Sequence, residues 1–343
     1  MLNKDKVKQM TVIKLSINSP SFGLLRQTKN FDGIWEDYKF EINNDVKECD
    51  VWVVYSKGFK KSESAHVKTG KKILITGEIE EIYSYSKSFI NQFDLVITQR
   101  KDIKHQNVIK LQPAQPWWVG RLNGFKAKDL EDFPLKFTDL EKKVDRKTKN
   151  LCVISSNKSF TKGHNERLKF VDKLQKAFDG DVDFYGKGFN DFDDKWDILK
   201  EYKYQVVIEN ASAVDYWTEK LADAFLAETL PFYHGAPNIS DYFSPHSLKE
   251  IDISRPEESI KIIKKTISEN YYEKSLEHIR QSKKLVLYEH NLIPLLKNFI
   301  ESNINLNDSS GSGEFKIFHE NTFFDIHKIP MILKRQYYNL WYK

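Results

Sequence analysis

The chain has 343 residues, of which 54 are Lys or Arg and 49 are Asp or Glu, so its formal net charge is +5. Apolar residues make up 40% and charged residues 30%, which is typical of a globular protein with a sizeable core. At roughly 150 residues per domain, this length predicts two domains. No stretch approaches the ~20 apolar residues of a membrane span, and the lysine-rich first residues, MLNKDKVKQM, do not resemble a secretory signal. These features predict a cytoplasmic protein.

The excess of basic residues is small, and its distribution matters more than its total. Acidic residues interrupt the basic clusters near Lys57, Lys68 and Lys142, so no concentrated patch is expected to bind nucleic acid. An anionic small substrate needs only two or three cations and is not excluded. Cys49 and Cys152 are expected to be small buried hydrophobic residues in a reducing environment.

The first half of the chain alternates short apolar runs with polar stretches. We expect these runs to be buried parallel strands, because they are rich in β-branched residues and bounded by polar or turn residues. Spacers of roughly 10 to 35 residues suit crossover helices and loops. Pro113 and Pro116 and a charged stretch end the pattern, which predicts a boundary near residue 145. The expected strands are residues 11–17, 51–55, 72–76, 94–98 and 107–111.

A second alternation begins at residue 151, and residues 305–315 (NLNDSSGSGEF) have the composition of a flexible linker. Two successive alternations predict an α/β fold in which two Rossmann-like domains face a cleft. The expected domains are residues 1–145 and 146–303, with a linker and tail over 304–343. The expected strands of the second half are residues 151–156, 182–186, 204–210 and 230–235, and its helices include 168–174, 218–228, 258–267 and 276–300.

The most informative segment is residues 202–235, where a buried strand leads into the polar pair Glu209 and Asn210. Thr218 is a good N-cap for the helix that follows. Lys220 lies in the first turn of this helix, where a cation is unfavourable unless an anion binds at the helix N-terminus. A capped helix with a solvated lysine is the alternative, and the physical chemistry alone leaves both open.

The run IENASAVDYWTEKL, followed by LPFYHGAPN, resembles the donor-binding signature of the α-1,3/4-fucosyltransferase family. That family has F-E-N-S, three or four residues, Y-x-T-E-K-[LI] and then P-[VI]-x-x-G. Ile208, Ala211 and Glu228 depart from the pattern at positions expected to pack. The matching residues are Glu209, Asn210, Tyr216, Thr218, Glu219, Lys220, Pro231 and Gly235.

Upstream, SSNKSFTKGHNERLKF resembles the strand, the S-N pair and the helix arginine of the same family, which adds Asn157 and Arg167 to the donor set. The resemblance implies an inverting, GDP-fucose-dependent enzyme of bacterial type with a GT-B fold. Arg167, Lys220 and the helix at Thr218 would stabilise the diphosphate. The other matched residues would bind the donor, and Asn210, Tyr216 and Glu219 would orient ribose and sugar.

The segment KILITGEIEE resembles the family's strand followed by T-G-E, which implies that Glu78 is the catalytic base, with Glu80 as the fallback. An exposed turn acid is the alternative. Trp117 and Trp118 lie where the family has an aromatic loop and are acceptor candidates, although tryptophans often anchor cores instead. His164 and His234 are expected near the donor site in structural roles.

No metal or other cofactor is expected. Asp181 and Asp183 form a D-x-D pair, but the following FYG fits a plain strand and turn. Gly186-Lys187-Gly188 lacks the third glycine of a dinucleotide fingerprint. Two cations and a helix N-terminus suffice in principle to neutralise a diphosphate.

The implied reaction is the transfer of L-fucose from GDP-fucose to a hydroxyl of an oligosaccharide or glycolipid acceptor, such as an N-acetyllactosamine-like glycan or a surface polysaccharide, in an α-1,3 or α-1,4 linkage. Two alternatives remain: a transferase for another guanosine-linked sugar, and a non-catalytic module that binds glycans or nucleotides. The tail MILKRQYYNLWYK combines aromatic and basic residues. It suits either the inner face of a membrane or packing across the two domains.

Overall fold

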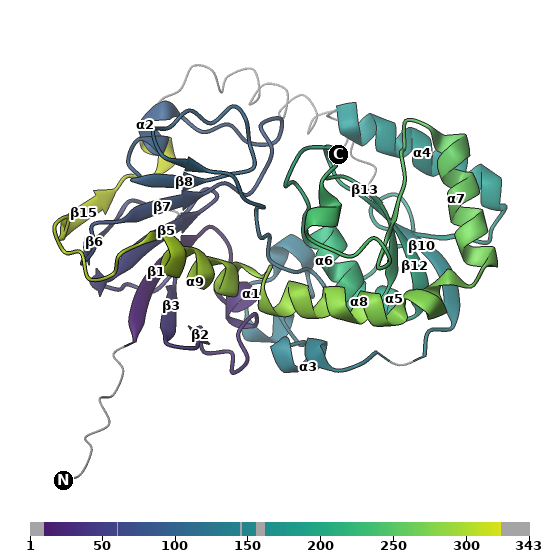
Figure 1. Cartoon of the computed structure of the whole chain (residues 1–343), viewed down its shortest axis with the longest axis horizontal. Coiled ribbons are helices and arrows are strands. Elements are labelled where there is room, and N and C mark those ends of the chain that lie inside the picture. Colours follow the sequence, from purple (N-terminus) through teal and green to yellow (C-terminus); the bar gives the residue numbers. More distant parts are fainter. Residues whose placement is uncertain (1–9, 60, 145, 156–161, 324–343) are drawn as a thin grey trace, which may run out of the picture.

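The computed structural model describes residues 10–59, 61–144, 146–155 and 162–323, which form two lobes side by side, each built on a mainly parallel sheet (Figure 1). The sheet of the N-terminal lobe has the order β2-β3-β1-β5-β7-β8-β9, and only the β2–β3 pair is antiparallel. Its strands are β1 (Thr11–Ile17), β2 (Ile34–Trp35), β3 (Tyr38–Ile42), β5 (Val51–Tyr55), β7 (Lys72–Ile75), β8 (Leu95–Ile97) and β9 (Val108–Ile109).

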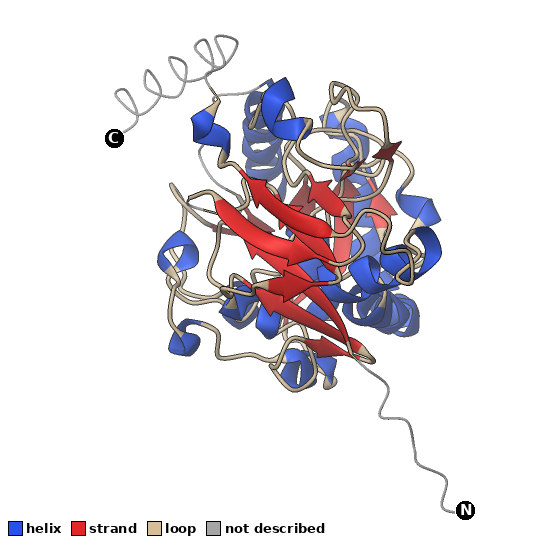
Figure 2. Cartoon of the chain, turned by 90° about the vertical axis from the view of Figure 1, so that its left-hand side faces the viewer, coloured by secondary structure: helices blue, strands red, loops and turns tan. Residues whose placement is uncertain are grey.

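The C-terminal lobe has a fully parallel sheet of order β11-β10-β12-β13-β14. Its strands are β10 (Lys149–Ile154), β11 (Asp183–Tyr185), β12 (Tyr202–Ile208), β13 (Leu230–His234) and β14 (Lys249–Glu250). Its helices are α4 (Lys162–Phe178), α5 (Lys195–Leu199), α6 (Glu219–Leu226), α7 (Pro256–Ser268) and α8 (Tyr271–Tyr288). Viewed from the side of the N-terminal lobe, the strands form the middle of the molecule and helices and loops surround them (Figure 2).

Each apolar run that was expected to be a strand forms one, and the α/β fold with two Rossmann-like lobes is confirmed. The expected crossover helices of the first half are mostly wrong. In the described part of that half, α1 (Phe22–Leu25) and α2 (Lys87–Ile90) are single turns. The spacers instead hold β3, β4 (Glu48–Cys49) and β6 (Glu63–Val67). β3 is not an apolar run, because the polar residues Lys39 and Glu41 alternate with its buried residues. The buried residues are Tyr38, Phe40 and Ile42.

The hydrophobic cores correct both predicted domain boundaries. Trp117, Val119 and the helix α3 (Phe137–Glu141) already pack in the core of the C-terminal lobe, well before residue 145. In the other direction, α9 (Leu292–Asn303) returns to the N-terminal lobe and packs beside β1, β5 and β7. The bounds 1–145 and 146–303 were predicted from changes in composition. The two cores are instead formed by apolar side chains that lie on both sides of these bounds.

The expected linker over residues 305–315 is partly structured. Residues from Gly313 onwards form β15 (Gly313–Ile317), which pairs antiparallel with β6, and β6 pairs parallel with β4. Ile317 is fully buried in the outer core of the N-terminal lobe. Short 3-10 turns complete the described elements at Gly124–Lys126, Leu130–Asp132, Ile239–Asp241 and Glu320–Thr322.

Cys49 and Cys152 are free and buried in different cores, as expected. Over the described ranges, every helix is too short or too polar to cross a membrane. The tail sequence MILKRQYYNLWYK lies outside the described residues, so its two interpretations stay predictions.

Candidate active site

Titratable side chains that follow strands of the N-terminal sheet interact electrostatically with titratable side chains that follow strands of the C-terminal sheet. Burial raises the pKa of Tyr216 well above its usual range, and the nearby charge of Glu78 from the other lobe adds to this effect. Glu209 and Glu219 raise the pKa of Lys220 against the effect of burial, and Glu78 adds to this rise. Burial raises the pKa of Tyr55, and the charges of Glu78 and Glu219 add to it. The expected base and the expected donor residues therefore come together, and the carboxyl ends of β5, β7 and β12 meet at one site.

Glu209 organises the C-terminal half of this site. It follows β12 directly, and its side chain is completely buried. Its carboxylate accepts hydrogen bonds from the backbone N–H of Thr218 at 2.8 Å and from the Thr218 hydroxyl at 2.7 Å. It also pairs with Lys220 Nζ at 3.1 Å. Both carboxylate oxygens are thus used within the protein, and Glu209 positions the start of α6.

Lys220 is a fixed cation in the first turn of α6. Burial lowers the pKa of Lys220, but Glu209 and Glu219 outweigh this effect and raise it, so the side chain stays charged. The Thr218 hydroxyl accepts from the Lys220 backbone N–H at 3.3 Å and lies 3.1 Å from Nζ. Backbone N–H groups at a helix start and a nearby cation are the elements of an anion site.

Glu219 faces two cations. Burial raises the pKa of its carboxyl group, but Lys220 and Lys195 oppose this and hold the pKa below its ordinary value. Glu219 is therefore ionised and able to accept hydrogen bonds from sugar hydroxyls.

Arg167 and Asn210, two residues of the expected donor set, are in contact with each other. Arg167 Nη1 donates to Asn210 Oδ1 at 3.2 Å, and Arg167 is buried on α4. The start of α4 lies so close to this turn that a Cβ on Gly163 would stand 2.3 Å from the carbonyl oxygen of Asn210. Any side chain at residue 163 would therefore displace the arginine helix from the site. The remaining member of the donor set, Asn157, lies outside the described residues.

The loop that carries Tyr216 is held rigidly. Asp215 has a positive φ of 61° and accepts hydrogen bonds from Asn238 Nδ2 at 2.8 Å and the Tyr242 hydroxyl at 2.7 Å. Tyr216 itself is fully buried, and its hydroxyl has no hydrogen-bond partner among the residues that the structure describes. A bound ligand would find this hydroxyl already in place.

On the opposite side, Glu78 follows β7 in a half-buried position. Arg100 Nη1 donates to the carbonyl oxygen of Glu78 at 3.3 Å, and Gln115 Nε2 donates to that of Gly77 at 2.7 Å. Glu80, the fallback, is exposed, and the charges that perturb the pKa of its carboxyl group all belong to the N-terminal lobe. The electrostatic contacts with the C-terminal lobe therefore favour Glu78 over Glu80.

The two acceptor candidates differ. Trp117 is 2% exposed and packs in the C-terminal core against Phe137, so it is not available to stack on a sugar, and this prediction is wrong. Trp118 is half-buried, and the guanidinium of Arg121 lies 4.6 Å from its ring centre. Adjacent side chains of an extended chain point in different directions, so Trp117 packs in the core while Trp118 does not.

Sequence reasoning missed Asp223, a fully buried acid on α6. Its Oδ1 accepts from the backbone N–H groups of Trp118 at 2.9 Å and Val119 at 3.1 Å. Its Oδ2 pairs with Lys195 Nζ at 2.8 Å. The available signal was one acid within the apolar run LADAFL, one turn after Glu219.

The histidines and the D-x-D pair have other environments. His164 is buried, and His234 Nδ1 lies 3.2 Å from the carbonyl oxygen of Ile251, which fits structural roles. Asp183 accepts from the Tyr202 hydroxyl at 2.5 Å. Across the described ranges, no group of three or more His, Cys, Asp or Glu side chains is arranged to hold a metal ion.

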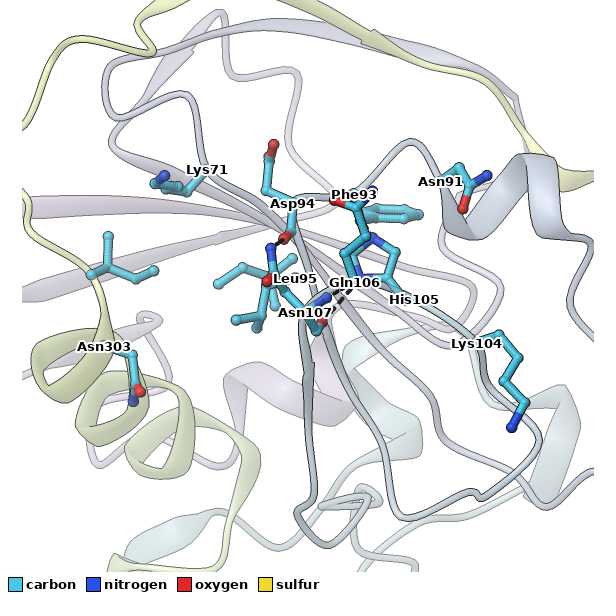
Figure 3. Close-up of a pocket in the computed structure, with 12 residues that line it drawn as sticks. Lys71, Asn91, Phe93, Asp94, Leu95, Lys104, His105, Gln106, Asn107 and Asn303 are labelled. Atoms are coloured by element: carbon cyan, nitrogen blue, oxygen red, sulfur yellow. Dashed lines mark hydrogen bonds between the residues drawn. The ribbon is translucent and has the colours of Figure 1, made fainter.

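A hollow of about 920 Å³ lies at the other edge of the N-terminal sheet (Figure 3). Its lining includes Lys71, Asp94 and Asn107, which precede β7, β8 and β9, whereas Glu78 follows β7. His105 in this hollow contacts the backbone oxygens of Phe93 and Asn107, each at 3.0 Å. The hollow is therefore separate from the candidate active site.

Comparison with known proteins agrees with this fold. The chain adopts the GT-B glycosyltransferase arrangement. A solved α-glucosyltransferase in complex with UDP and a 13-mer DNA superposes with a TM-score of 0.50 at 9% identity, over 85% of this chain and 100% of that one. Residues 144–274 match the model of glycosyltransferase family 10 (fucosyltransferase), C-terminal part.

Two curated relatives illustrate the sequence match. The α-(1,3)-fucosyltransferase FucT of Helicobacter pylori is 35% identical over 71 residues, which cover 20% of this chain and 15% of that protein. The α-(1,3)-fucosyltransferase B of Drosophila melanogaster is 32% identical over 127 residues, or 35% of this chain and 27% of that protein. The chain thus spans well under a third of the length of either relative. A crystal structure of an α1,3-fucosyltransferase with GDP has a TM-score of 0.47 at 17% identity, over 85% of this chain and 95% of that one.

Proposed function

We propose that this chain is an inverting fucosyltransferase of bacterial type that moves L-fucose from GDP-fucose to a hydroxyl of an acceptor glycan, in an α-1,3 or α-1,4 linkage. The observation that carries the proposal is the ion pair between Glu209 and Lys220 at the start of α6, with Glu78 of the other lobe close enough to affect the pKa of Lys220. This arrangement lies within the segment that matches family 10, and the matched relatives are named fucosyltransferases.

In the proposed reaction, the acceptor oxygen attacks the anomeric carbon of fucose from one face while GDP leaves from the other. The acceptor proton passes to the Glu78 carboxylate, and the electron pair of the breaking C–O bond leaves with the β-phosphate oxygen. Lys220 and Arg167 stabilise the charge that develops on this diphosphate. Asn210, Tyr216 and Glu219 hold ribose and sugar in line.

Glu209 and Thr218 take positioning roles in this scheme. Glu209 and Thr218 bond to each other and to Lys220, and so orient this cation towards the diphosphate. Neither side chain contacts the nucleotide in this scheme. Two cations and a helix N-terminus lead us to propose that the transfer proceeds without a divalent metal. An assay with and without a chelator tests this point, because a lost turnover that Mn²⁺ or Mg²⁺ restores would contradict it.

The central test is incubation with GDP-fucose and N-acetyllactosamine, with detection of trisaccharide and GDP. Glu78→Gln should lower kcat by about 10²- to 10⁴-fold with GDP affinity unchanged, and Glu80→Gln is the matched control that should keep turnover. Lys220→Ala should raise the GDP dissociation constant roughly 10- to 100-fold, which corresponds to a charge-assisted hydrogen bond. Near-normal transfer by Glu78→Gln would reject the base.

Two alternatives have distinct outcomes. If the enzyme uses another guanosine-linked sugar as its donor, that donor would outcompete GDP-fucose in the same assay. A non-catalytic module would bind GDP or glycan but turn over no acceptor of a panel. The cytoplasmic location, and contact of residues 331–343 with the inner face of a membrane, belong to this proposal and rest on composition; sedimentation with anionic vesicles tests the membrane contact.

A further inference from the structure

Gln99 follows β8 at the carboxyl edge of the N-terminal sheet, where β7 and β9 are the neighbouring strands. Ile97 of β8 is in register with Ile75 of β7 and Ile109 of β9. The pairing continues past the strand ends, because Thr76 N donates to the Ile97 oxygen at 3.0 Å and Thr98 N to the Ile109 oxygen at 2.9 Å. The same register, extended beyond these two hydrogen bonds, sets Gln99 beside Gly77 on one side and beside the residues after β9 on the other.

The Gln99 side chain is 6% exposed, and neither its amide oxygen nor its amide nitrogen has a hydrogen-bond partner in the described part of the chain. A buried amide without partners costs roughly 1–3 kcal/mol. Neighbouring glutamines do not share this state. Gln112 bonds to Ala114 N at 2.6 Å and to the His290 oxygen at 3.1 Å, and Gln115 bonds to the Gly77 oxygen at 2.7 Å.

The surroundings of Gln99 connect it to the candidate active site. Gly77 precedes Glu78, whose charge reaches Lys220 and Tyr216 of the C-terminal lobe. On the other flank, burial lowers the pKa of Lys110, and Asp215 of the C-terminal lobe is among the acids that oppose this effect. The Gln99 amide, which has no partner in the described part of the chain, thus follows β8 at the same edge of the sheet at which Glu78 follows the neighbouring β7.

We propose that Gln99 is a specificity-determining residue that binds hydroxyl groups of the acceptor sugar, next to the hydroxyl from which Glu78 removes the proton. Its amide oxygen accepts from one hydroxyl and its amide nitrogen donates to another, which suits a vicinal pair. The inference rests on the proposed function. It assigns the acceptor rather than the donor because Gln99 belongs to the lobe of Glu78, whereas Arg167 and Lys220 belong to the opposite lobe.

The test replaces the amide with an apolar side chain of similar length, Gln99→Met. We expect the KM for N-acetyllactosamine to rise at least tenfold, with the KM for GDP-fucose and the GDP dissociation constant unchanged. We also expect an equal or higher melting temperature, because the substitution removes a buried polar group that has no partner among the described residues. A group that merely supports the fold would lower the melting temperature and leave the acceptor KM unchanged.

Gln205→Met is the matched control. Gln205 is 4% exposed, its Oε1 also lacks a partner in the described chain, and it lies within β12, away from the strand end. This variant should leave the acceptor KM unchanged. An acceptor KM within twofold of the parent in Gln99→Met, or a rise in the donor KM instead, would overturn the assignment of Gln99 and leave the transferase proposal intact.

Saturation-transfer NMR with N-acetyllactosamine in the presence of GDP separates the two proposals. Binding by the parent that Gln99→Met abolishes supports the sugar site even if transfer fails. If the parent neither binds nor modifies this disaccharide or any glycan of a panel, the sugar site and the transferase proposal are both rejected.

Discussion

Lys220 Nζ lies 3.1 Å from Glu209 Oε2, and this ion pair joins the carboxyl end of β12 to the first turn of α6. The Glu209 side chain is fully buried, whereas that of Lys220 is 25% exposed. The cation therefore has one face against a fixed anion and another towards the junction of the lobes. A carboxylate that holds the cation in the free protein competes with any anion that binds there.

Glu209→Gln tests this competition. Removal of one partner of a buried pair costs about 3–5 kcal/mol, so we expect a marked loss in the free energy of unfolding without ligand. Saturating GDP should narrow the gap to the parent, because the diphosphate supplies Lys220 with another anion. The measurement is urea denaturation with and without GDP.

Glu228→Gln is the control for that experiment. Glu228 is also buried and pairs with Arg280 at 3.0 Å and Lys283 at 3.1 Å. The difference in the free energy of unfolding between the parent and Glu228→Gln should be the same with and without GDP. An equal gap with and without GDP in Glu209→Gln would mean that Lys220 does not meet the diphosphate.

Asp223 fastens the loop that passes between the lobes to α6, and Lys195 completes its ion pair. Asp223→Asn keeps one acceptor oxygen but removes the charge, which leaves Lys195 against a neutral amide. We expect a loss of about 3–5 kcal/mol in the free energy of unfolding and a higher KM, because the Trp118 backbone loses its fixed position.

A double-mutant cycle with Lys195→Met measures the coupling. The double variant should be more stable than Asp223→Asn alone, because it no longer buries an unpaired cation. If the two single effects on the free energy of unfolding were strictly additive, Asp223 and Lys195 would not be energetically coupled.

The strands were predictable from sequence because local patterns determine them. TVIKLSI becomes β1 with Ile13 to Ile17 buried, and VWVVY becomes β5 with every residue buried. The path of the chain between the lobes was not predictable, because α9 could pack on either sheet and its apolar residues do not specify which. The same holds for β15, whose glycine- and serine-rich approach is typical of a linker although Ile317 completes a distant core.

Ile317→Ala should therefore destabilise the N-terminal lobe. Loss of a fully buried isoleucine typically costs about 2–5 kcal/mol through lost transfer energy and a residual cavity. The neighbouring Phe318 is 40% exposed, so Phe318→Ala should change the free energy of unfolding by no more than ~0.5 kcal/mol. Equal effects of the two substitutions in denaturant titrations would show that β15 docks without burying Ile317.

Much of the candidate site could be proposed from the sequence because Asn210 and Lys220 belong to one contiguous motif, and the structure adds the contact between Arg167 and Asn210. Three features could not be proposed in this way. Trp117 enters a core that the sequence does not locate, Asp223 contacts a loop 105 residues away, and the isolation of the Gln99 amide depends on all its neighbours at once. Each depends on contacts between distant segments.

Lys147 provides a test of stability against pH. It is 4% exposed, and its Nζ donates to the Leu199 oxygen at 2.6 Å and to the Thr229 hydroxyl at 3.0 Å. Burial lowers the pKa of Lys147 from 10.5 to about 7, and neighbouring Glu228 only partly opposes this effect. Between these two pH values the unfolded chain binds a proton that the folded chain does not.

The free energy of unfolding should therefore rise with pH above 7, with a slope of at most about 1.4 kcal/mol per pH unit from this group. Lys283, whose pKa burial also lowers, contributes in the same direction. Lys147→Met should flatten the dependence between pH 7 and 8.5, a window below the ordinary pKa of cysteine and tyrosine. Denaturant titrations across this window measure both slopes, and an unchanged slope in the variant would mean that Lys147 remains protonated when buried.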